Sequence, residues 1–91
     1  MVDVHLYTTP TCYFCMQAKQ LLNSKGIQFR ELSIARDPDL RNEMMSLSGR
    51  RTVPQIWIGQ DHVGGCDDLM ALESSGQLDV MLTDQNKRLE A

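Results

Sequence analysis

Two cysteines, Cys12 and Cys15, are the residues of this chain best suited to chemistry. They form a C-x-x-C pair directly after the alternating apolar segment 2–7 and at the start of a helical pattern. At this spacing, one thiolate can attack an external disulfide while the second thiol lies close enough to resolve the mixed disulfide. The pair therefore predicts thiol–disulfide exchange, although zinc sites also use this spacing.

The expected position of Cys12 favours the role of nucleophile. Unpaired N–H groups at a helix N-terminus stabilise a thiolate, which is the reactive form of cysteine. Cys15 lies one turn further into the helix, so we expect it to be less exposed and more thiol-like. We assign Cys12 as the attacking nucleophile and Cys15 as the resolving thiol; the alternative is two cysteines without a chemical role.

Composition predicts one small globular domain. The chain has 91 residues, of which 42% are apolar and 23% are charged, as in folded domains of this size. We place the domain at residues 1–82 and a polar C-terminal tail at 83–91. With a net charge of −3, the sequence shows no basic face for nucleic acid. Its apolar runs are too short for a membrane span.

The cysteine content predicts a reducing compartment. The sequence contains three cysteines, an odd number that argues against a fully paired disulfide framework. Met1 is followed at once by strand-like sequence, without the basic and then apolar segments of a signal peptide. We therefore expect a cytoplasmic protein, where cysteine pairs are more often catalytic or metal-binding than structural, and we expect a monomer.

Apolar periodicity and turn residues predict an alternating order of elements. Asp37 and Pro38 give a strong helix start, as N-cap and first helical residue. Gly26, Gly49 and Gly76 mark helix ends. The predicted strands are 2–7, 27–30, 55–58 and 62–64, and the predicted helices are 13–25, 38–48, 66–75 and a short one around 78–82. The alternation breaks at 31–34, which indicates a bulge or an early strand end.

This order, β-α-β-α-β-β-α, predicts an α/β fold of thioredoxin type. A helical crossover should make the first two strands parallel, while the last two form an antiparallel hairpin. Together they give a mixed four-stranded sheet with helices on both faces. Cys12 then lies beyond the carboxyl ends of the parallel strands, where reactive groups of α/β sheets gather.

Four segments carry a resemblance to the glutaredoxins, most closely to the bacterial glutaredoxin 3 type. They cover the chain from about residue 2 to 82 in the family's order and spacing. The segments are Leu6-Tyr7-Thr8 with Thr11-Cys12-Tyr13-Phe14-Cys15, then Ser48-Gly49-Arg50, then Thr52-Val53-Pro54-Gln55-Ile56, and finally Gly64-Gly65-Cys66-Asp67-Asp68-Leu69. Thr-Val-Pro before a strand, together with Gly-Gly-Cys-Asp-Asp, is far more specific than C-x-x-C alone.

The resemblance implies a dithiol enzyme that uses glutathione as electron donor. Its substrates would be protein disulfides and protein–glutathione mixed disulfides. Pro54 would follow a cis peptide bond, and the backbone of Val53 would pair with the cysteine of glutathione. Asp67 and the N–H of Cys66 would hold the γ-glutamyl end, at a helix start that also attracts a carboxylate on physical grounds. The implied glutathione-binding residues are Phe14, Thr52, Val53, Pro54, Gln55, Gly65, Cys66 and Asp67.

The chain departs from the family pattern at two places. Tyr13-Phe14 stands between the cysteines where many relatives have Pro-Tyr, and Thr9 stands where relatives often carry a lysine. Arg50 and Arg51 are the candidates to supply that missing charge. Some relatives without the proline bind a [2Fe–2S] cluster between two protomers, so this alternative stays open beside the expectation of no metal.

Several residues have competing interpretations. We expect Cys66 to be a small helix-start residue, the alternative being a third redox thiol. A zinc site of His62 with the three cysteines is the metal alternative. His5 is expected to be solvent-facing or hydrogen-bonded, and Trp57 to pack in the sheet. A thioredoxin-like protein served by a reductase is the competing enzyme class, although no tryptophan precedes Cys12.

Overall fold

Four strands form one mixed sheet in the order β2-β1-β3-β4. A computed structural model describes the backbone of residues 3–90 and the side chains of residues 3–83. The elements are β1 (Val4–Thr8), α1 (Tyr13–Ser24), β2 (Arg30–Ser33), α2 (Pro38–Ser48), β3 (Gln55–Ile58), β4 (Asp61–Gly64), α3 (Cys66–Ser75) and α4 (Gln77–Glu90). β1 runs parallel to β2 and antiparallel to β3, and β3 and β4 form the hairpin. The predicted thioredoxin-like architecture is confirmed.

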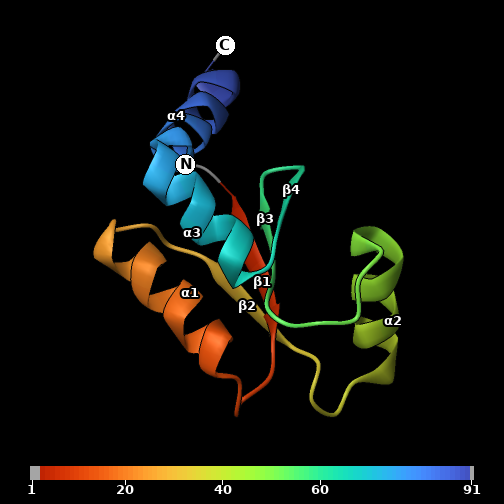
Figure 1. The fold of residues 1–91 in the computed structure, drawn as a ribbon. Helices are drawn as coiled ribbons and strands as arrows, with labels where there is room; N and C mark the ends of the chain where they lie inside the picture. Colours follow the sequence, from red (N-terminus) through yellow and green to blue (C-terminus); the bar gives the residue numbers. More distant parts are fainter. Residues whose placement is uncertain (1–2, 91) are drawn as a thin grey trace.

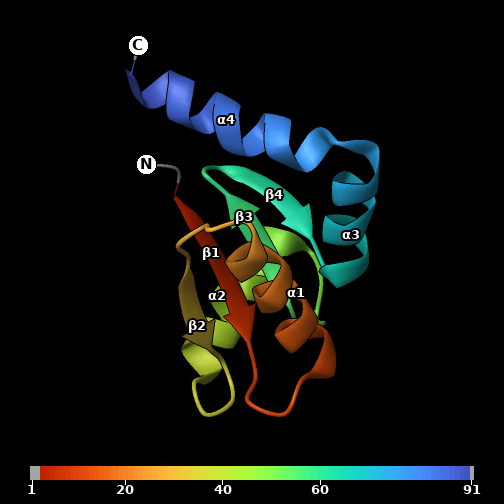
Figure 2. The same cartoon turned by 90° about the vertical axis from the view of Figure 1, so that its left-hand side faces the viewer.

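Helices cover both faces of the sheet (Figure 1). Alternation along β1 separates two cores, because successive side chains of a strand point to opposite faces. Val4 and Leu6 are buried against α1, α3 and α4, in a cluster that includes Ala18, Leu22 and Leu69. Tyr7 on the opposite face packs with Trp57, Ile34 and Met44 beneath α2. Figure 2 shows α4 running across the end of the sheet above β4.

Helix ends follow the local signals. The Asp37 carboxylate accepts the N–H of Leu40 at 3.0 Å, and Pro38 is the first residue of α2. Gly49 after α2 and Gly76 after α3 have φ values of +70° and +79°, the left-handed conformation that glycine adopts without steric cost.

The second strand was predicted too early. β2 begins at Arg30, where it pairs with His5, rather than ending there. The backbone N–H of Ile27 instead donates to Leu22 at 3.0 Å, which closes the C-terminus of α1 in a Schellman-type turn. Ile27 and Phe29 still pack on the larger core, so their apolar alternation reflects burial without strand pairing.

Three smaller differences concern element ends and faces. β1 ends at Thr8 rather than residue 7, and residue 2 lies outside the described part. The helical spacing of Leu40, Met44 and Leu47 predicts one shared face, but Leu47 is 61% exposed whereas Met44 is fully buried. α4 continues to Glu90 through most of the expected polar tail, because Gln, Lys, Arg, Leu and Glu all favour helix. The division into a domain and a tail stays a prediction.

Candidate active site

Cys12 occupies the N-cap position of α1, at the end of the loop that follows β1. Its sulfur accepts the backbone N–H of Cys15 at 3.1 Å, as an N-cap oxygen would. The Cys12 thiol also donates to the carbonyl oxygen of Val53 at 3.7 Å. The sulfur therefore lies where the N–H groups and the dipole of α1 stabilise negative charge, as the sequence predicted.

Cys15 has the opposite surroundings. Its side chain is 1% exposed. Burial, followed by a hydrogen bond to Cys12, raises the pKa of Cys15 to about 12, against smaller opposing effects of the Thr9 backbone and Lys19. Cys15 is thus a thiol at neutral pH until its partner sulfur reacts. The prediction that Cys15 is less exposed than Cys12 is confirmed.

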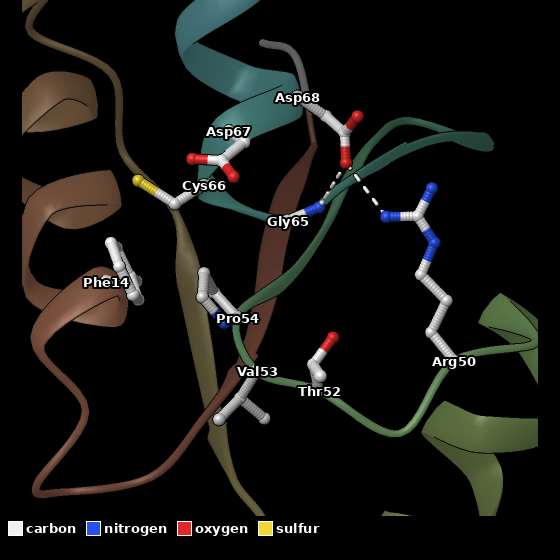
Figure 3. Close-up of a pocket in the computed structure, with 9 residues that line it drawn as sticks. All are labelled: Phe14, Arg50, Thr52, Val53, Pro54, Gly65, Cys66, Asp67 and Asp68. Atoms are coloured by element: carbon white, nitrogen blue, oxygen red, sulfur yellow. Dashed lines mark hydrogen bonds and ion pairs between the residues drawn. The ribbon is translucent and has the colours of Figure 1, made fainter.

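A pocket of about 260 Å³ lies beside this cysteine pair. Figure 3 shows Phe14 of α1 on one side, the loop before β3 below, the start of α3 above and Arg50 on the far side. The Val53–Pro54 bond is cis, as the resemblance implied. The lining residues are Phe14, Arg50, Thr52, Val53, Pro54, Gly65, Cys66, Asp67 and Asp68.

Opposite charges meet at the rim of the pocket. Arg50 Nη1 donates to Asp68 Oδ2 at 2.8 Å, and the same oxygen accepts the Gly65 N–H at 2.9 Å. The Gly65 N–H and then the Arg50 guanidinium hold the pKa of Asp68 below its usual range. Asp67, the neighbouring residue, is exposed and also lines the pocket. The pocket therefore presents a guanidinium, a carboxylate and the N-terminal N–H groups of α3 to a zwitterionic ligand.

The structure brings together most of the residues that the sequence indicated. Phe14, Thr52, Val53, Pro54, Gly65, Cys66 and Asp67 all line the pocket. Gln55 does not line it: the residue is fully buried, and its side-chain amide bonds to Thr52 and His62 behind the pocket wall. The Gln55 side chain therefore does not reach the pocket surface, and its place among the glutathione-binding residues stays a prediction.

Asp68 was missed as a pocket residue, and Arg50 was only one of two candidates. Arg50 reaches the pocket, whereas Arg51 is not among its lining residues. The available signal was the spacing of Gly65 and Asp68, because an acid at the third helical position caps the preceding N–H. That carboxylate then attracts the nearest cation, which is Arg50.

The other cysteine and the histidines have structural surroundings. Cys66 is 5% exposed and belongs to the larger core, and burial raises its pKa, which fits the expected helix-start role. Among the described residues, no three His, Cys, Asp or Glu side chains gather as a metal site would require. His62 bonds to Gln55 instead of approaching the cysteines. His5 was predicted wrongly, since its Nδ1 is buried without a hydrogen-bond partner.

Comparisons with known proteins identify the family. The sequence model of the Glutaredoxin family matches residues 4–63. Glutaredoxin 3 of Escherichia coli K12 is 52% identical over 82 residues, which cover 90% of this chain and 99% of the relative. The chain belongs to the glutaredoxin family. It is a thiol–disulfide oxidoreductase of the bacterial glutaredoxin 3 type.

Solved glutaredoxins share the fold. The solution structure of glutaredoxin from Brucella melitensis is 56% identical, with a TM-score of 0.80, and covers 90% of this chain and 89% of its own. A buckwheat glutaredoxin–glutathione complex is 28% identical with a TM-score of 0.84, over 91% of this chain and 78% of the plant protein. No helix in the described part of this glutaredoxin is both long and apolar enough to span a membrane.

Proposed function

We propose that this glutaredoxin takes its electrons from glutathione and reduces protein disulfides and protein–glutathione mixed disulfides. One observation carries the proposal: the Cys12 sulfur contacts the Val53 carbonyl, and Val53 itself lines a pocket that holds charges of both signs. Glutathione is a zwitterionic peptide with a central thiol, so it suits such a pocket. The solved buckwheat relative, which is a glutathione complex, supports the assignment.

The proposed binding mode follows from the chemistry of the walls. The peptide backbone of Val53 pairs with the cysteine of glutathione, in the manner of an added strand. Asp67 accepts from the γ-glutamyl ammonium, while the Cys66 N–H at the start of α3 donates to the adjacent carboxylate. Arg50 supplies the cation that Thr9 does not, and it faces the second carboxylate of the tripeptide. Phe14 and Pro54 provide apolar contact on either side.

Reduction of a mixed disulfide needs only Cys12. Its thiolate attacks the glutathione sulfur of a protein–glutathione disulfide, so that a Cys12–glutathione bond forms and the protein thiolate leaves. A second glutathione thiolate then attacks the glutathione sulfur bound to Cys12. This step releases glutathione disulfide and restores the Cys12 thiolate, with two electrons transferred overall.

Reduction of a protein disulfide also needs Cys15. Cys12 attacks one sulfur of the substrate and the other sulfur leaves as a thiolate. Cys15 then loses its proton to that leaving thiolate or to water and attacks the Cys12 sulfur, which releases the reduced protein and leaves a Cys12–Cys15 disulfide. Two glutathiones reduce this disulfide. Because Cys15 is buried and neutral beforehand, it acts only after the first exchange.

We infer that the protein works as a monomer in the cytoplasm. A dithiol that acts as a reductant needs a glutathione pool that keeps it reduced, and the proposed mechanism uses residues of a single chain. The odd number of cysteines argues against a fully paired disulfide framework, which is consistent with a reducing compartment.

The test is a glutathione-coupled assay with two substrates, a small glutathione mixed disulfide and a protein disulfide. Cys12→Ser should lower turnover of both by about a thousandfold or more, since no nucleophile remains. Cys15→Ser should keep activity on the mixed disulfide within severalfold and lose activity on the protein disulfide. Equal rates for the wild type and both variants would reject the roles assigned to the two cysteines.

Replacement of Asp67 tests the glutathione pocket separately. Asp67→Ala should raise the glutathione concentration needed for half-maximal rate by about tenfold, which is the weight of one charge-assisted hydrogen bond. Its effect on the reactivity of Cys12 toward a neutral alkylating agent should be small. An unchanged glutathione requirement would contradict the proposed γ-glutamyl contact.

A further inference from the structure

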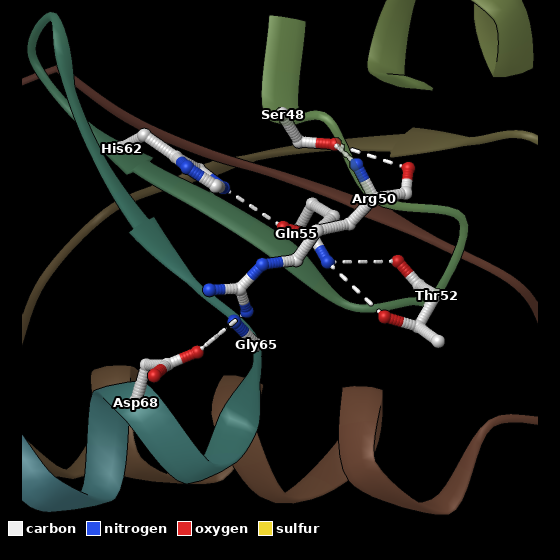
Figure 4. Close-up of polar contacts among 7 residues, drawn as sticks. All are labelled: Ser48, Arg50, Thr52, Gln55, His62, Gly65 and Asp68. Atoms are coloured by element: carbon white, nitrogen blue, oxygen red, sulfur yellow. Dashed lines mark hydrogen bonds and ion pairs between the residues drawn. The ribbon is translucent and has the colours of Figure 1, made fainter.

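A chain of hydrogen bonds runs from the outer strand of the sheet to the wall of the pocket (Figure 4). His62 Nε2 lies 2.8 Å from Gln55 Oε1. Gln55 Nε2 donates to the carbonyl oxygen of Thr52 at 3.0 Å and to its hydroxyl at 3.3 Å. Thr52 lines the pocket directly before the cis bond. A residue of β4 is thereby connected to the pocket through one buried side chain.

The chemistry of His62, Gln55 and Thr52 allows only one arrangement of donors and acceptors along these hydrogen bonds. The Thr52 carbonyl can only accept, so Gln55 must turn its NH₂ group toward it. The Gln55 oxygen is then the atom that faces His62, and it can only accept. His62 must therefore carry its proton on Nε2, and it donates to Gln55. Reversing the Gln55 amide would place two oxygens against each other at Thr52 and leave His62 without an acceptor.

The register of the sheet brings His62 to this position. A bulge between Ile56 and Trp57 makes Trp57 pair with His62 while Ile56 pairs with Gly64. His62 thus shares a face with Trp57 and with Gln55, two residues earlier on β3. The centroids of the His62 and Trp57 rings lie 4.6 Å apart, and the ring planes are tilted by 34°. This contact restricts the orientation of the imidazole.

Burial of Gln55 makes this chain of hydrogen bonds costly to break. Gln55 is 0% exposed, and a buried amide that loses a partner retains its full desolvation penalty. His62 itself is exposed at the surface. Desolvation where its ring packs, and then the nearby Arg50 guanidinium, lower the pKa of His62, against a smaller opposing effect of Asp68. At neutral pH the ring is therefore the neutral tautomer with its proton on Nε2.

We propose that His62 is a positioning residue, which acts through Gln55 to hold Thr52 and the adjoining pocket wall in the geometry that binds the thiol substrate. The inference rests on the proposed glutathione-dependent function and assigns to that site a residue outside it. His62 makes no contact with the reacting sulfurs, so its loss should weaken glutathione binding and leave the exchange chemistry unchanged.

Two substitutions of similar size separate hydrogen bonding from packing. The amide nitrogen of a glutamine side chain can lie near the place of a histidine Nε2, whereas an asparagine is too short to reach Gln55. His62→Asn should raise the glutathione concentration for half-maximal rate by about threefold to tenfold, the weight of one hydrogen bond, with kcat within twofold. His62→Gln should restore the wild-type value.

His5→Asn is the matched control, because it also removes an imidazole ring from Trp57. His5 also stacks on Trp57, with ring centroids 5.4 Å apart and an interplanar angle of 3°, but it has no hydrogen bond to Gln55. This variant should show the wild-type glutathione requirement. If His5→Asn and His62→Asn raise that requirement equally, loss of packing on Trp57 explains both effects and the positioning role is overturned.

A measurement without glutathione distinguishes this inference from the proposed function. In ¹⁵N NMR spectra of the ligand-free protein, the Gln55 side-chain NH₂ should be protected from exchange, and His62→Asn should remove this protection and shift the Thr52 signal. Unaltered Gln55 and Thr52 signals in His62→Asn would overturn the inference whatever the assay gives. If the wild type does not use glutathione but His62→Asn shows these NMR changes, the proposed function is refuted and the chain of hydrogen bonds is retained.

Discussion

At the scale of single residues, one helical turn gives two cysteines opposite properties. The Cys12 sulfur caps α1, and the N–H that it accepts belongs to Cys15. Cys15 is the third residue of the same helix and is buried. A hydrogen bond from the backbone N–H of Cys15 thus connects the attacking sulfur to the residue that will later resolve its mixed disulfide. Burial sets the order of events, because a neutral buried thiol does not compete for the substrate.

Alkylation tests this difference between the two thiols. Iodoacetamide applied briefly at pH 7.5 should modify Cys12 at least about tenfold faster than Cys15, because thiolate and access both govern the rate. The raised pKa of about 12 at Cys15 predicts that its labelling increases as the pH rises toward that value. Fragment mass spectrometry assigns the modified sulfur. Equal modification of both cysteines at pH 7.5 would contradict the burial of Cys15.

At the scale of elements, the turn between β4 and α3 joins helix capping to the pocket. Asp68 caps the Gly65 N–H and pairs with Arg50 through one oxygen. Gly64 has a φ of +116°, and a Cβ atom at this position would overlap the Asp68 carboxylate. Ser48 further fixes this region, since its hydroxyl accepts the Arg50 N–H at 3.0 Å. The geometry of one glycine therefore supports the charges at the pocket rim.

Gly64→Ala should disturb both stability and binding. The positive φ and the displaced carboxylate together should lower the free energy of unfolding by about 2 kcal/mol and raise the glutathione requirement severalfold. Gly26→Ala is the control, because Gly26 also has a positive φ of +70° but its Cβ would meet nothing within 4 Å. Urea unfolding and the coupled assay measure the two effects. A pocket unaffected by Gly64→Ala would show that Asp68 does not depend on this close approach.

Local signals made the capped elements predictable, and tertiary contacts made the rest unpredictable. The positions of Cys12, Asp37 and Gly76 follow from short-range rules on helix ends. The start of β2 at Arg30 depends on its pairing with β1, which sequence periodicity does not report. Leu47 has the helical spacing of a buried residue, but α2 lies on the sheet only along the side of Met44.

The same distinction applies to the site. The two cysteines and the residues around Pro54 and Asp67 stand in short motifs, so they could be assigned from spacing and resemblance. The contacts of Gln55 and Arg50 join segments that are 7 and 18 residues apart, and they exist only once the strands are paired. Side-chain direction in a bulged hairpin is set by register, which one sequence does not reveal.

Across the protein, the two faces of the sheet differ in chemistry. The face beneath α1, α3 and α4 packs an apolar cluster around Leu6 and Leu22, and Thr8 on the same face of β1 donates to Glu31 at 2.8 Å. The face toward α2 contains polar rings: Tyr7 donates to Glu43 at 2.9 Å, while His5 and His62 both pack on Trp57. Burial, as the largest effect, lowers the pKa of both histidines from the ordinary value of 6.5. Stability should therefore depend on pH in mildly acidic solution.

The sign of this dependence follows from proton linkage. As the pH falls through 6.5, the unfolded chain binds protons at both histidines before the folded protein does, so the free energy of unfolding declines from its full value above 6.5. Glu31 and Asp68, whose pKa values are lowered mainly by hydrogen bonds, add a loss only below the ordinary carboxylate range. Urea midpoints between pH 7.5 and 5 should fall, and His5→Phe should reduce the slope. If the urea midpoint of His5→Phe falls with pH as steeply as that of the wild type, protonation of His5 is not a cause of the pH dependence.

A ribosome synthesises Cys12 and Cys15 well before β3, the antiparallel neighbour that β1 needs to complete its ladder. At synthesis rates of about 5–20 residues per second, the nascent chain carries both thiols outside a finished fold for a few seconds. During that interval the unfinished fold does not bury Cys15, so only a reducing thiol pool would protect the two thiols from oxidation. The central place of β1 thus makes correct maturation depend on the same thiol pool that we propose drives the mature enzyme.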